Sequence, residues 1–390
     1  MILTAIVIAL LLDQIRSVER DHAVTGLLRR WIHAAAEYVD AGERKHAWLA
    51  WALAVAVPAL AAGLAGWVCA RAAGWFGQLV WNVVVLYFTL GFRQFSYRYT
   101  AIRDALARSE QAKARDLLAQ WQDVEAEPYG QPPRDNTAAR ASAATQDAAQ
   151  GVIARGVIGH AVLSAHRCVF GVLFWFCLLA LPGLAPAGAV LYRQAELAAR
   201  YWRHKAYQSD ATVSPGLLVV SQTAWAVIDW LPARVTALVF AIVGNFEDAI
   251  AAWRQRDADG IGSHSDASAD NDAIVLAAAA GALGLRLMDI RAEPGVAPSP
   301  ADSAAKTAAS TTVESCHADL ADMHQPPHPP DWEPATPLDD AASASAADAC
   351  ALFGAEPDPR HFAQVAGLLW RSVALWLLLL ILLSLAHVLG

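Results

Sequence analysis

The chain has few charged residues. Asp, Glu, Lys and Arg make up 17% of its 390 residues, against about 25% in a typical soluble domain. It has five cysteines without a repeated spacing, so no disulfide framework is predicted. In place of charge it has 56% hydrophobic residues and 15 tryptophans. This composition is typical of membrane proteins that carry aromatic belts at the lipid interface.

Several motifs of soluble enzymes are also absent. The sequence has no phosphate-binding P-loop, no glycine-rich dinucleotide fingerprint and no Gly-x-Ser-x-Gly nucleophile elbow. It has no nucleic-acid-binding module, so we expect no nucleic-acid partner and assign its basic segments to lipid headgroups and membrane topology. Cys316, His317, His324 and His328 are soft metal ligands, but they lack a second cysteine partner, so no metal site is predicted.

The charges that are present are unevenly distributed. Residues 257–359 contain 18 acidic and 3 basic residues, which leaves 19 acidic and 26 basic residues in the rest of the chain. The stretch 291–359 is rich in Ala, Ser, Asp and Pro, which is typical of a disordered acidic linker. We therefore predict a membrane domain over 1–290, this linker over 291–359, and a C-terminal transmembrane anchor over 360–390.

Long apolar runs predict an all-α polytopic integral membrane protein with about four or five membrane segments and amphipathic cytoplasmic helices. Ile2–Leu12 is interpreted as a retained anchor, because it lacks a basic start and a signal-peptide cleavage site. Trp48–Cys69 and Trp75–Leu90 should form a helical hairpin, and Arg371–Val388 is a further span. Phe95–Val124 is predicted as one amphipathic cytoplasmic helix.

The apolar stretch Cys168–Leu191 is interrupted at Pro182–Pro186, where we expect the helix to break. The segments on either side of this stretch, Phe92–Arg167 and Tyr192–Pro215, are both basic. The positive-inside rule places both on the cytoplasmic side. A re-entrant or tightly broken hairpin is therefore predicted, in place of a single crossing.

Composition predicts two more elements between the spans. Gln131–Gln150 is rich in Ala, Thr, Asn and Gln, and we expect it to form a loop. Ala273–Met288 is expected to form a small Ala-rich helix whose N-terminal cap is Asn271 or Asp272.

The run Trp225–Phe246 is apolar and aromatic, yet it contains Asp229, Pro232 and Arg234. Ionised side chains in lipid are costly unless they pair with each other, face a cavity or lie at the interface. Asp229 and Arg234 are therefore candidates for a working surface inside the membrane domain. The alternative is an interfacial helix whose Arg234 extends to the lipid headgroups.

Acidic residues follow this run directly. Glu247 and Asp248 would meet Arg234 or a divalent cation near the interface, since carboxylates are the ligands that Mg²⁺ prefers when it carries a nucleotide. The alternative is that Asn245 and its neighbours only end the helix.

A basic pair, His166-Arg167, precedes the apolar stretch that begins at Cys168. One interpretation is that the pair recognises a phosphate or a carboxylate. The other is that a positive charge at a membrane boundary only orients the helix.

Four segments of the chain resemble the CobD/CbiB cobalamin-biosynthesis family, namely Leu173–Phe176, Pro186–Arg193, Asp229–Leu238 and Ala277–Leu287. Their order and rough spacing match over most of the chain outside the acidic linker. The resemblance implies a multi-pass protein of the bacterial inner membrane with adenosylcobinamide-phosphate synthase chemistry. This reaction joins adenosylcobyric acid to an aminopropanol phosphate through an ATP-dependent amide bond.

The same resemblance implies cofactors, partners and site residues. ATP and Mg²⁺ would be the cofactors, with Glu247 and Asp248 binding the magnesium nucleotide and Arg234 holding a phosphate or a carboxylate. The lipid bilayer, a corrinoid substrate and other cobalamin-pathway proteins would be the partners. The catalytic residues would be Asp229, Arg234, Glu247 and Asp248, and the substrate-binding residues would be His166, Arg167, Arg193, Asn245 and His264.

The AmpE family of β-lactamase-induction regulators is the alternative, because it is similar in its membrane scaffold. The Asp229–Arg234 core and the terminal anchor resemble that group too. Acidic motifs of the synthase are replaced here, for example by Leu163-Ser164, and this favours a non-enzymatic membrane regulator. The segment Gly281–Leu287 favours the cobalamin family.

Overall fold

The computed structural model describes residues 2–15, 23–40, 43–108, 110–126, 146–207, 213–259, 267–287 and 354–389. These residues belong to one compact unit, which comprises Met1–Met288 and Leu352–Gly390. The predicted linker up to residue 353 lies outside the described residues.

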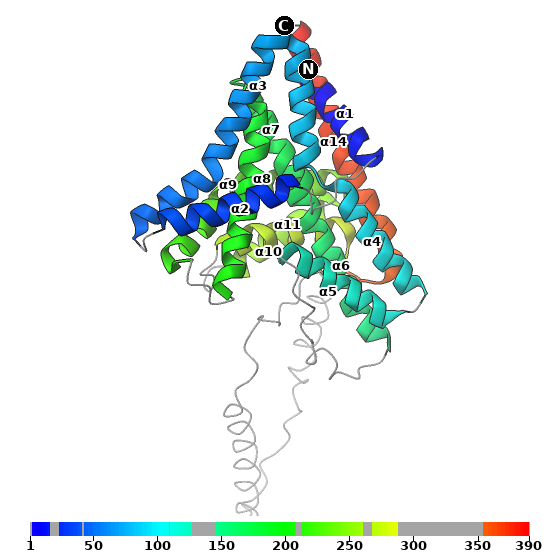
Figure 1. The fold of residues 1–390 in the computed structure, drawn as a ribbon. Coiled ribbons are helices and arrows are strands. Elements are labelled where there is room, and N and C mark those ends of the chain that lie inside the picture. Colours follow the sequence, from blue (N-terminus) through cyan, green and yellow to red (C-terminus); the bar gives the residue numbers. More distant parts are fainter. Residues whose placement is uncertain are drawn as a thin grey trace, which may run out of the picture. The chain divides into compact units, whose positions relative to one another are not determined.

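The described elements are helices (Figure 1), apart from one isolated parallel bridge between Leu285 and Ala355. Within the described ranges, four helices are long and apolar enough to cross a membrane. The predicted all-α polytopic membrane class is therefore confirmed. The elements are α1 (Ile2–Ile15), α2 (Ala23–Val39), α3 (Arg44–Thr89), α4 (Phe92–Ala107), α5 (Gln111–Ala126), α6 (Gln146–Ala165), the π-helix η2 (His166–Phe170), α7 (Gly171–Ala180), α8 (Ala185–Tyr207), α9 (Pro215–Val243), α10 (Phe246–Asp259), α11 (Ala267–Leu283), the 3₁₀ turn η3 (Pro359–His361) and α14 (Phe362–Leu389).

Helix α3 is a hairpin of two apolar arms, as its sequence predicts (Figure 1). The arms meet at Ala73 and Gly74, which leave helical geometry, and Gly74 has a φ of 60° that favours glycine. The arms pack closely, because a Cβ added at Gly66 would lie 3.0 Å from the Trp81 ring. The indole of Trp81 also donates a 2.9 Å hydrogen bond to the Ala62 carbonyl on the opposite arm.

Helices α7 and α8 form the second predicted hairpin, and its turn falls within the proline-containing segment 181–184. Gly183 adopts a φ of 81° in this turn. A Cβ at Gly188 would lie 2.1 Å from the Trp175 carbonyl oxygen, so glycine is needed for the close contact of the two helices. A Cβ at Gly63 in α3 would lie 3.2 Å from Ala187, so the start of α8, just after the turn, packs against the first arm of the α3 hairpin.

Each of two prolines inside the apolar helices removes a backbone donor, and a side chain from the α7–α8 hairpin replaces it. Pro232 has no N–H for the Ile228 carbonyl, which accepts a 3.1 Å bond from the Trp175 indole. Pro58 likewise leaves the Ala54 carbonyl without its helical donor, and Gln194 donates to it at 3.3 Å. Lipid offers no water to carbonyls freed in this way, so these bonds hold both kinked helices against the hairpin.

The two ends of the undescribed segment meet at the isolated bridge. Arg286 donates from its backbone N–H to the Ala355 carbonyl at 3.0 Å, and Ala355 donates to the Gly284 carbonyl at 2.8 Å. Helix α14 then begins beside α4, where the Tyr99 hydroxyl donates a 2.9 Å bond to the Phe362 carbonyl. The C-terminal helix is therefore part of the same body as the helices that precede the linker.

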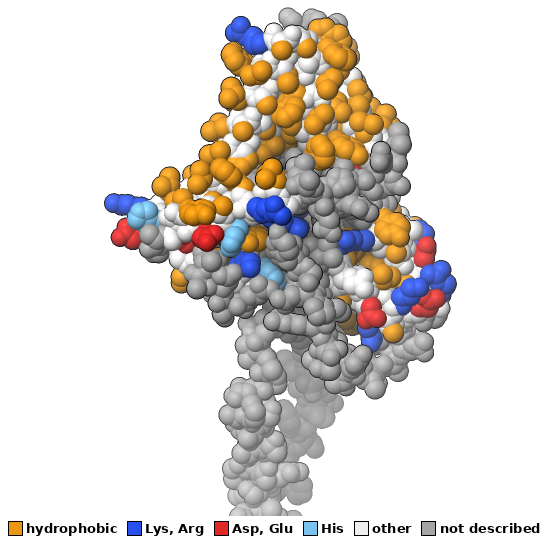
Figure 2. Space-filling model, in the orientation of Figure 1, with side chains coloured by type: hydrophobic (Ala, Val, Ile, Leu, Met, Phe, Trp, Pro, Cys, Tyr) orange, Lys and Arg blue, Asp and Glu red, His pale blue; other side chains and the backbone are white. Residues whose placement is uncertain are grey.

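Figure 2 shows hydrophobic side chains over most of the α3 hairpin, while charged side chains gather near α2, α4 and α5. Helix α9 packs against α11, α8, α3, α10 and α14. It therefore brings the run that carries Asp229 into the centre of the body.

Three sequence predictions need correction. Phe95–Val124 forms two helices, α4 and α5, because Glu110 begins a new helix with its carboxylate 3.2 Å from both Arg108 and Lys113. Residues 146–150 of the predicted loop are helical and open α6. Helix α11 begins at Ala267, so Asn271 and Asp272 lie inside it and do not cap it.

We predict that Trp175→Phe lowers the free energy of unfolding in detergent by about 1–3 kcal/mol, because the part-buried Ile228 carbonyl loses its donor. In a Pro232→Ala background the new backbone N–H restores a helical donor to the Ile228 carbonyl. Trp175→Phe should then lower the free energy of unfolding by clearly less. Trp75→Phe at the exposed tip of α3 is the matched control and should have little effect. Equal costs in both backgrounds would contradict the assignment.

The two hairpins also predict topology. Reporter fusions at Gln131 and Tyr207 should give the same cytoplasmic signal, because α7 and α8 return the chain to the side from which it came. A reporter inserted at Gly74 should give the opposite signal. A periplasmic signal at Tyr207 would show that α7 and α8 are not a returning hairpin.

Candidate functional site

Asp229 of α9 is fully buried and accepts two hydrogen bonds on one carboxylate oxygen. The Tyr192 hydroxyl of α8 donates to Oδ1 at 2.7 Å, and His166 Nε2 lies 3.0 Å from the same atom. With Asp229 ionised, both groups act as donors. The other ring nitrogen of His166 lies 2.9 Å from the Thr236 hydroxyl, one and a half to two turns further along α9. We call Asp229, His166, Tyr192 and Thr236 the buried tetrad.

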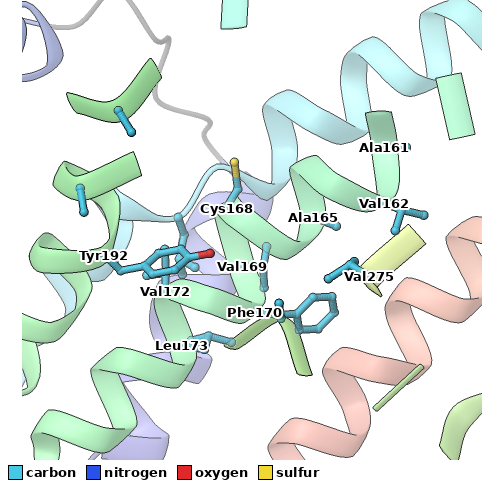
Figure 3. Close-up of a cluster of buried hydrophobic side chains, with 14 of the residues drawn as sticks. Ala161, Val162, Ala165, Cys168, Val169, Phe170, Val172, Leu173, Tyr192 and Val275 are labelled. Carbon is cyan, nitrogen blue, oxygen red and sulfur yellow. The ribbon is translucent and has the colours of Figure 1, made fainter. Parts of the chain in front are cut away.

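The second carboxylate oxygen of Asp229, Oδ2, is buried and has no hydrogen-bond partner among the residues that the structure describes. An unsatisfied buried acceptor costs about 1–3 kcal/mol, and more when it is charged. Apolar side chains surround the tetrad, and Figure 3 shows Tyr192 reaching from α8 toward Cys168, Val169 and Val172. Oδ2 is therefore the tetrad atom that can accept a hydrogen bond from a bound ligand.

His166 and Arg167 open the π-helix η2 and face different helices. The π-helix interrupts the continuous helix α6–α7 at these residues, and such π-turns often occur at functional sites. His166 contacts Asp229 and Thr236 on α9, whereas Arg167 forms an ion pair with Asp272 on α11. Both predicted substrate-binding residues therefore lie at the same cluster, and His166 is buried.

Asp272 belongs to this charged cluster, although the sequence suggested only a helix cap. Burial raises the pKa of Asp272 above its usual range, and the Arg167 guanidinium acts in the opposite direction. The charges of Asp229, His166 and Arg203 also act on this carboxyl group, which shows how near it lies to the tetrad. Its Oδ1 is a second buried carboxylate oxygen without a hydrogen-bond partner.

Arg234 does not pair with Asp229. It follows Asp229 by five residues, which places the two side chains about 140° apart around the helix. Its guanidinium carbon lies 4.1 Å from the centre of the Trp230 ring, and it donates to the Trp230 carbonyl at 3.0 Å and to Asn271 Oδ1 at 3.3 Å. Arg234 thus lies on the exposed aromatic edge of α9 and links it to α11.

Arg193 directly follows Tyr192 of the tetrad on α8. It forms an ion pair with the buried Glu196, and Arg200 lies 2.6 Å from the other oxygen of that carboxylate. Arg193 also approaches the Cys168 sulfur at 3.6 Å. The predicted substrate-binding residue is therefore part of an Arg–Glu–Arg cluster that the sequence did not indicate.

The remaining predicted residues lie elsewhere. Asn245 begins α10, where its amide donates to Asp248 Oδ2 at 2.5 Å and its own backbone N–H bonds to Ala282 at 3.2 Å. This geometry agrees with the helix-end interpretation of Asn245. Glu247 and Asp248 are exposed in the first turn of α10. His264 lies outside the described residues.

These acidic residues do not fit a magnesium-nucleotide site that includes Asp229. The α9 segment from Asp229 to Val243 alone spans about 21 Å, which is too far for one reaction centre. In the described ranges, no group of three or more His, Cys, Asp or Glu side chains could hold a metal ion. The predicted catalytic set is therefore divided between the tetrad, the Arg234 edge and the start of α10.

Comparison with known proteins identifies related sequences. The chain is 28% identical over 292 residues to the cobalamin biosynthesis protein CobD of Chromobacterium violaceum, covering 72% of this chain and 79% of that protein. It is 25% identical over 254 residues to CobD of Stutzerimonas stutzeri, covering 63% of this chain and 67% of that protein. The chain is thus similar to two CobD proteins over most of its own length and most of theirs. No family model and no solved structure matches it.

The CobD/CbiB resemblance seen in the sequence is thereby confirmed. Two of its four segments supply residues of the tetrad, since Pro186–Arg193 contains Tyr192 and Asp229–Leu238 contains Asp229 and Thr236. The likeness to the AmpE regulators stays a prediction, because both relatives carry the CobD name.

We predict that Tyr192→Phe lowers the free energy of unfolding by about 1.5–3 kcal/mol, because Asp229 loses a donor to a charged acceptor. In an Asp229→Leu background the acceptor is gone, and the same change should cost little. Tyr97→Phe, on an exposed side chain, is the control. A cost for Tyr192→Phe that does not depend on residue 229 would disprove the hydrogen bond.

Proposed function

We propose that the chain acts in cobalamin biosynthesis as a CobD-type protein of the bacterial inner membrane. The match to two CobD proteins over most of their length supports this role. The four apolar helices support a membrane location. Neither relative favours the regulator alternative.

The proposed reaction is the one the family resemblance implies, in which an amine and a carboxylic acid are joined to form an amide at the expense of ATP. ATP would supply the activation of the acid, and no residue described here is assigned to it. The tetrad would act on the amine. An N–H of this group would donate to Asp229 Oδ2, the buried oxygen that has no partner.

Asp229 would then take up, on Oδ2, the proton that the amine loses as the amide forms, while His166 and Tyr192 keep their hydrogen bonds to Oδ1. The His166 Nε2–H is held on Asp229 Oδ1, and Tyr192 donates to the same oxygen, so the carboxylate is fixed in orientation. Because Asp229 is fully buried, the amine would enter between α8, α9 and α11. The unpartnered Oδ2 is the observation on which this assignment depends.

Complementation tests the proposal. In a bacterium that lacks its own CobD, the wild-type chain should restore cobalamin production. Asp229→Asn keeps the shape of the side chain but removes its charge, so it should lower production at least about tenfold, as expected for loss of a general base. Asp104→Asn, on an exposed residue of α4, should be as active as the wild type.

The abundance of each variant in the membrane fraction is measured in parallel. Failure of the wild-type chain at normal abundance would reject the role in cobalamin biosynthesis. Full activity of Asp229→Asn would reject the catalytic assignment and leave the tetrad with a structural role.

A further inference from the structure

Helix α2 presents an apolar stripe that the described part of the chain does not cover. Ile32, Ala35 and Ala36 are buried against neighbouring helices, since α2 packs on α3 and α8. Leu27, Trp31 and Tyr38 are nevertheless 66%, 40% and 82% exposed. They are spaced by four and seven residues and therefore lie on one face of the helix.

The polar residues of α2 occupy a third face. Arg30, His33 and Glu37 are spaced by three and four residues, and His33 and Glu37 approach each other to 3.7 Å. At about 100° per residue, the exposed apolar stripe lies between the buried face and this polar face. This order is what an amphipathic helix at the surface of a bilayer requires, with apolar side chains below and polar ones above.

The stripe is continuous with the apolar surface of α3. The Trp31 indole donates a 3.1 Å hydrogen bond to the Leu53 carbonyl of α3. Leu49 and Val57, one turn before and one turn after Leu53, are themselves exposed. This arm of α3 belongs to an apolar helix long enough to cross a membrane, so lipid around it would also reach α2.

Contacts of α2 place it at the ends of other helices. Asp40, directly after α2, accepts a 3.1 Å bond from the Ser214 N–H, where α9 begins. The His33 ring lies 6.4 Å from Tyr201, near the end of α8. The chain changes from apolar to polar at these ends, with Arg44 and Lys45 opening α3 and His204 and Lys205 closing α8. Such a change marks a membrane–water interface.

We infer that α2 lies in the plane of the bilayer at headgroup level, with Leu27, Trp31 and Tyr38 inserted among phospholipid acyl chains. The polar face carries both Arg30 and Glu37, so no particular headgroup charge is needed. The occupant of the stripe is therefore the phospholipid itself, and the helix sets the depth of the protein in the membrane.

Lipid quenching tests this inference. The full-length protein is placed in phospholipid nanodiscs with one copy per disc, and a fluorescent amino acid is incorporated at position 27 or 38. Position 30 or 37 on the polar face serves as the matched control. Lipids brominated on the acyl chains should quench the fluorophore at 27 and 38 at least about twofold more than at 30 and 37.

Equal quenching on both faces would overturn the inference. The measurement is repeated in nanodiscs that hold two copies of the protein. Loss of lipid quenching at positions 27 and 38 in these discs alone would also overturn the inference, because a second copy would then cover the stripe. Two labelled positions on each face keep the test valid if one label prevents folding.

Discussion

The need to satisfy every backbone carbonyl inside an apolar environment determines how the helices of this protein fit together. Pro58 and Pro232 each leave one carbonyl without a helical donor, and Gln194 and Trp175 supply the replacements. Both donors come from the α7–α8 hairpin. The hairpin is therefore fixed to α3 on one side and to α9 on the other. This fixes Tyr192 and His166, on the same continuous segment, against Asp229.

The buried tetrad shows how a membrane domain can hold a carboxyl group away from water. Removal of a carboxylate from water is costly, and it is offset only when the group is paired and hydrogen-bonded. Asp229 has two donors on one oxygen and none on the other, so the compensation is incomplete. Arg234 does not complete it, because its guanidinium lies on Trp230 and Asn271. An incomplete set of this kind is expected of a site that awaits a ligand.

The local features of the fold could be predicted from sequence, whereas the long-range contacts could not. Gly74 and Pro182 interrupt apolar runs, so both hairpins were predictable. Asp229 stood out as a charge in an apolar run. Of its partners, His166 was a candidate from the sequence, whereas Tyr192 and Thr236 carry no local signal. The nearby Asp272 resembled a helix cap. Glu247 and Asp248 were grouped with Asp229 because they are close in sequence. The C-terminal half of helix α9 lies between them, however, and keeps them far apart in space.

The bridge between Leu285 and Ala355 has a consequence for how the gene can change. The described chain stops at residue 287 and resumes at residue 354, and these flanks pair at adjacent backbone positions, so the intervening segment closes an excursion of the backbone. The entropy of closing such an excursion grows only slowly, by about 0.6 kcal/mol for each doubling of its length. Insertions and deletions there are therefore nearly neutral for folding. The length and composition of this segment can vary among relatives while the helices around Asp229 stay unchanged.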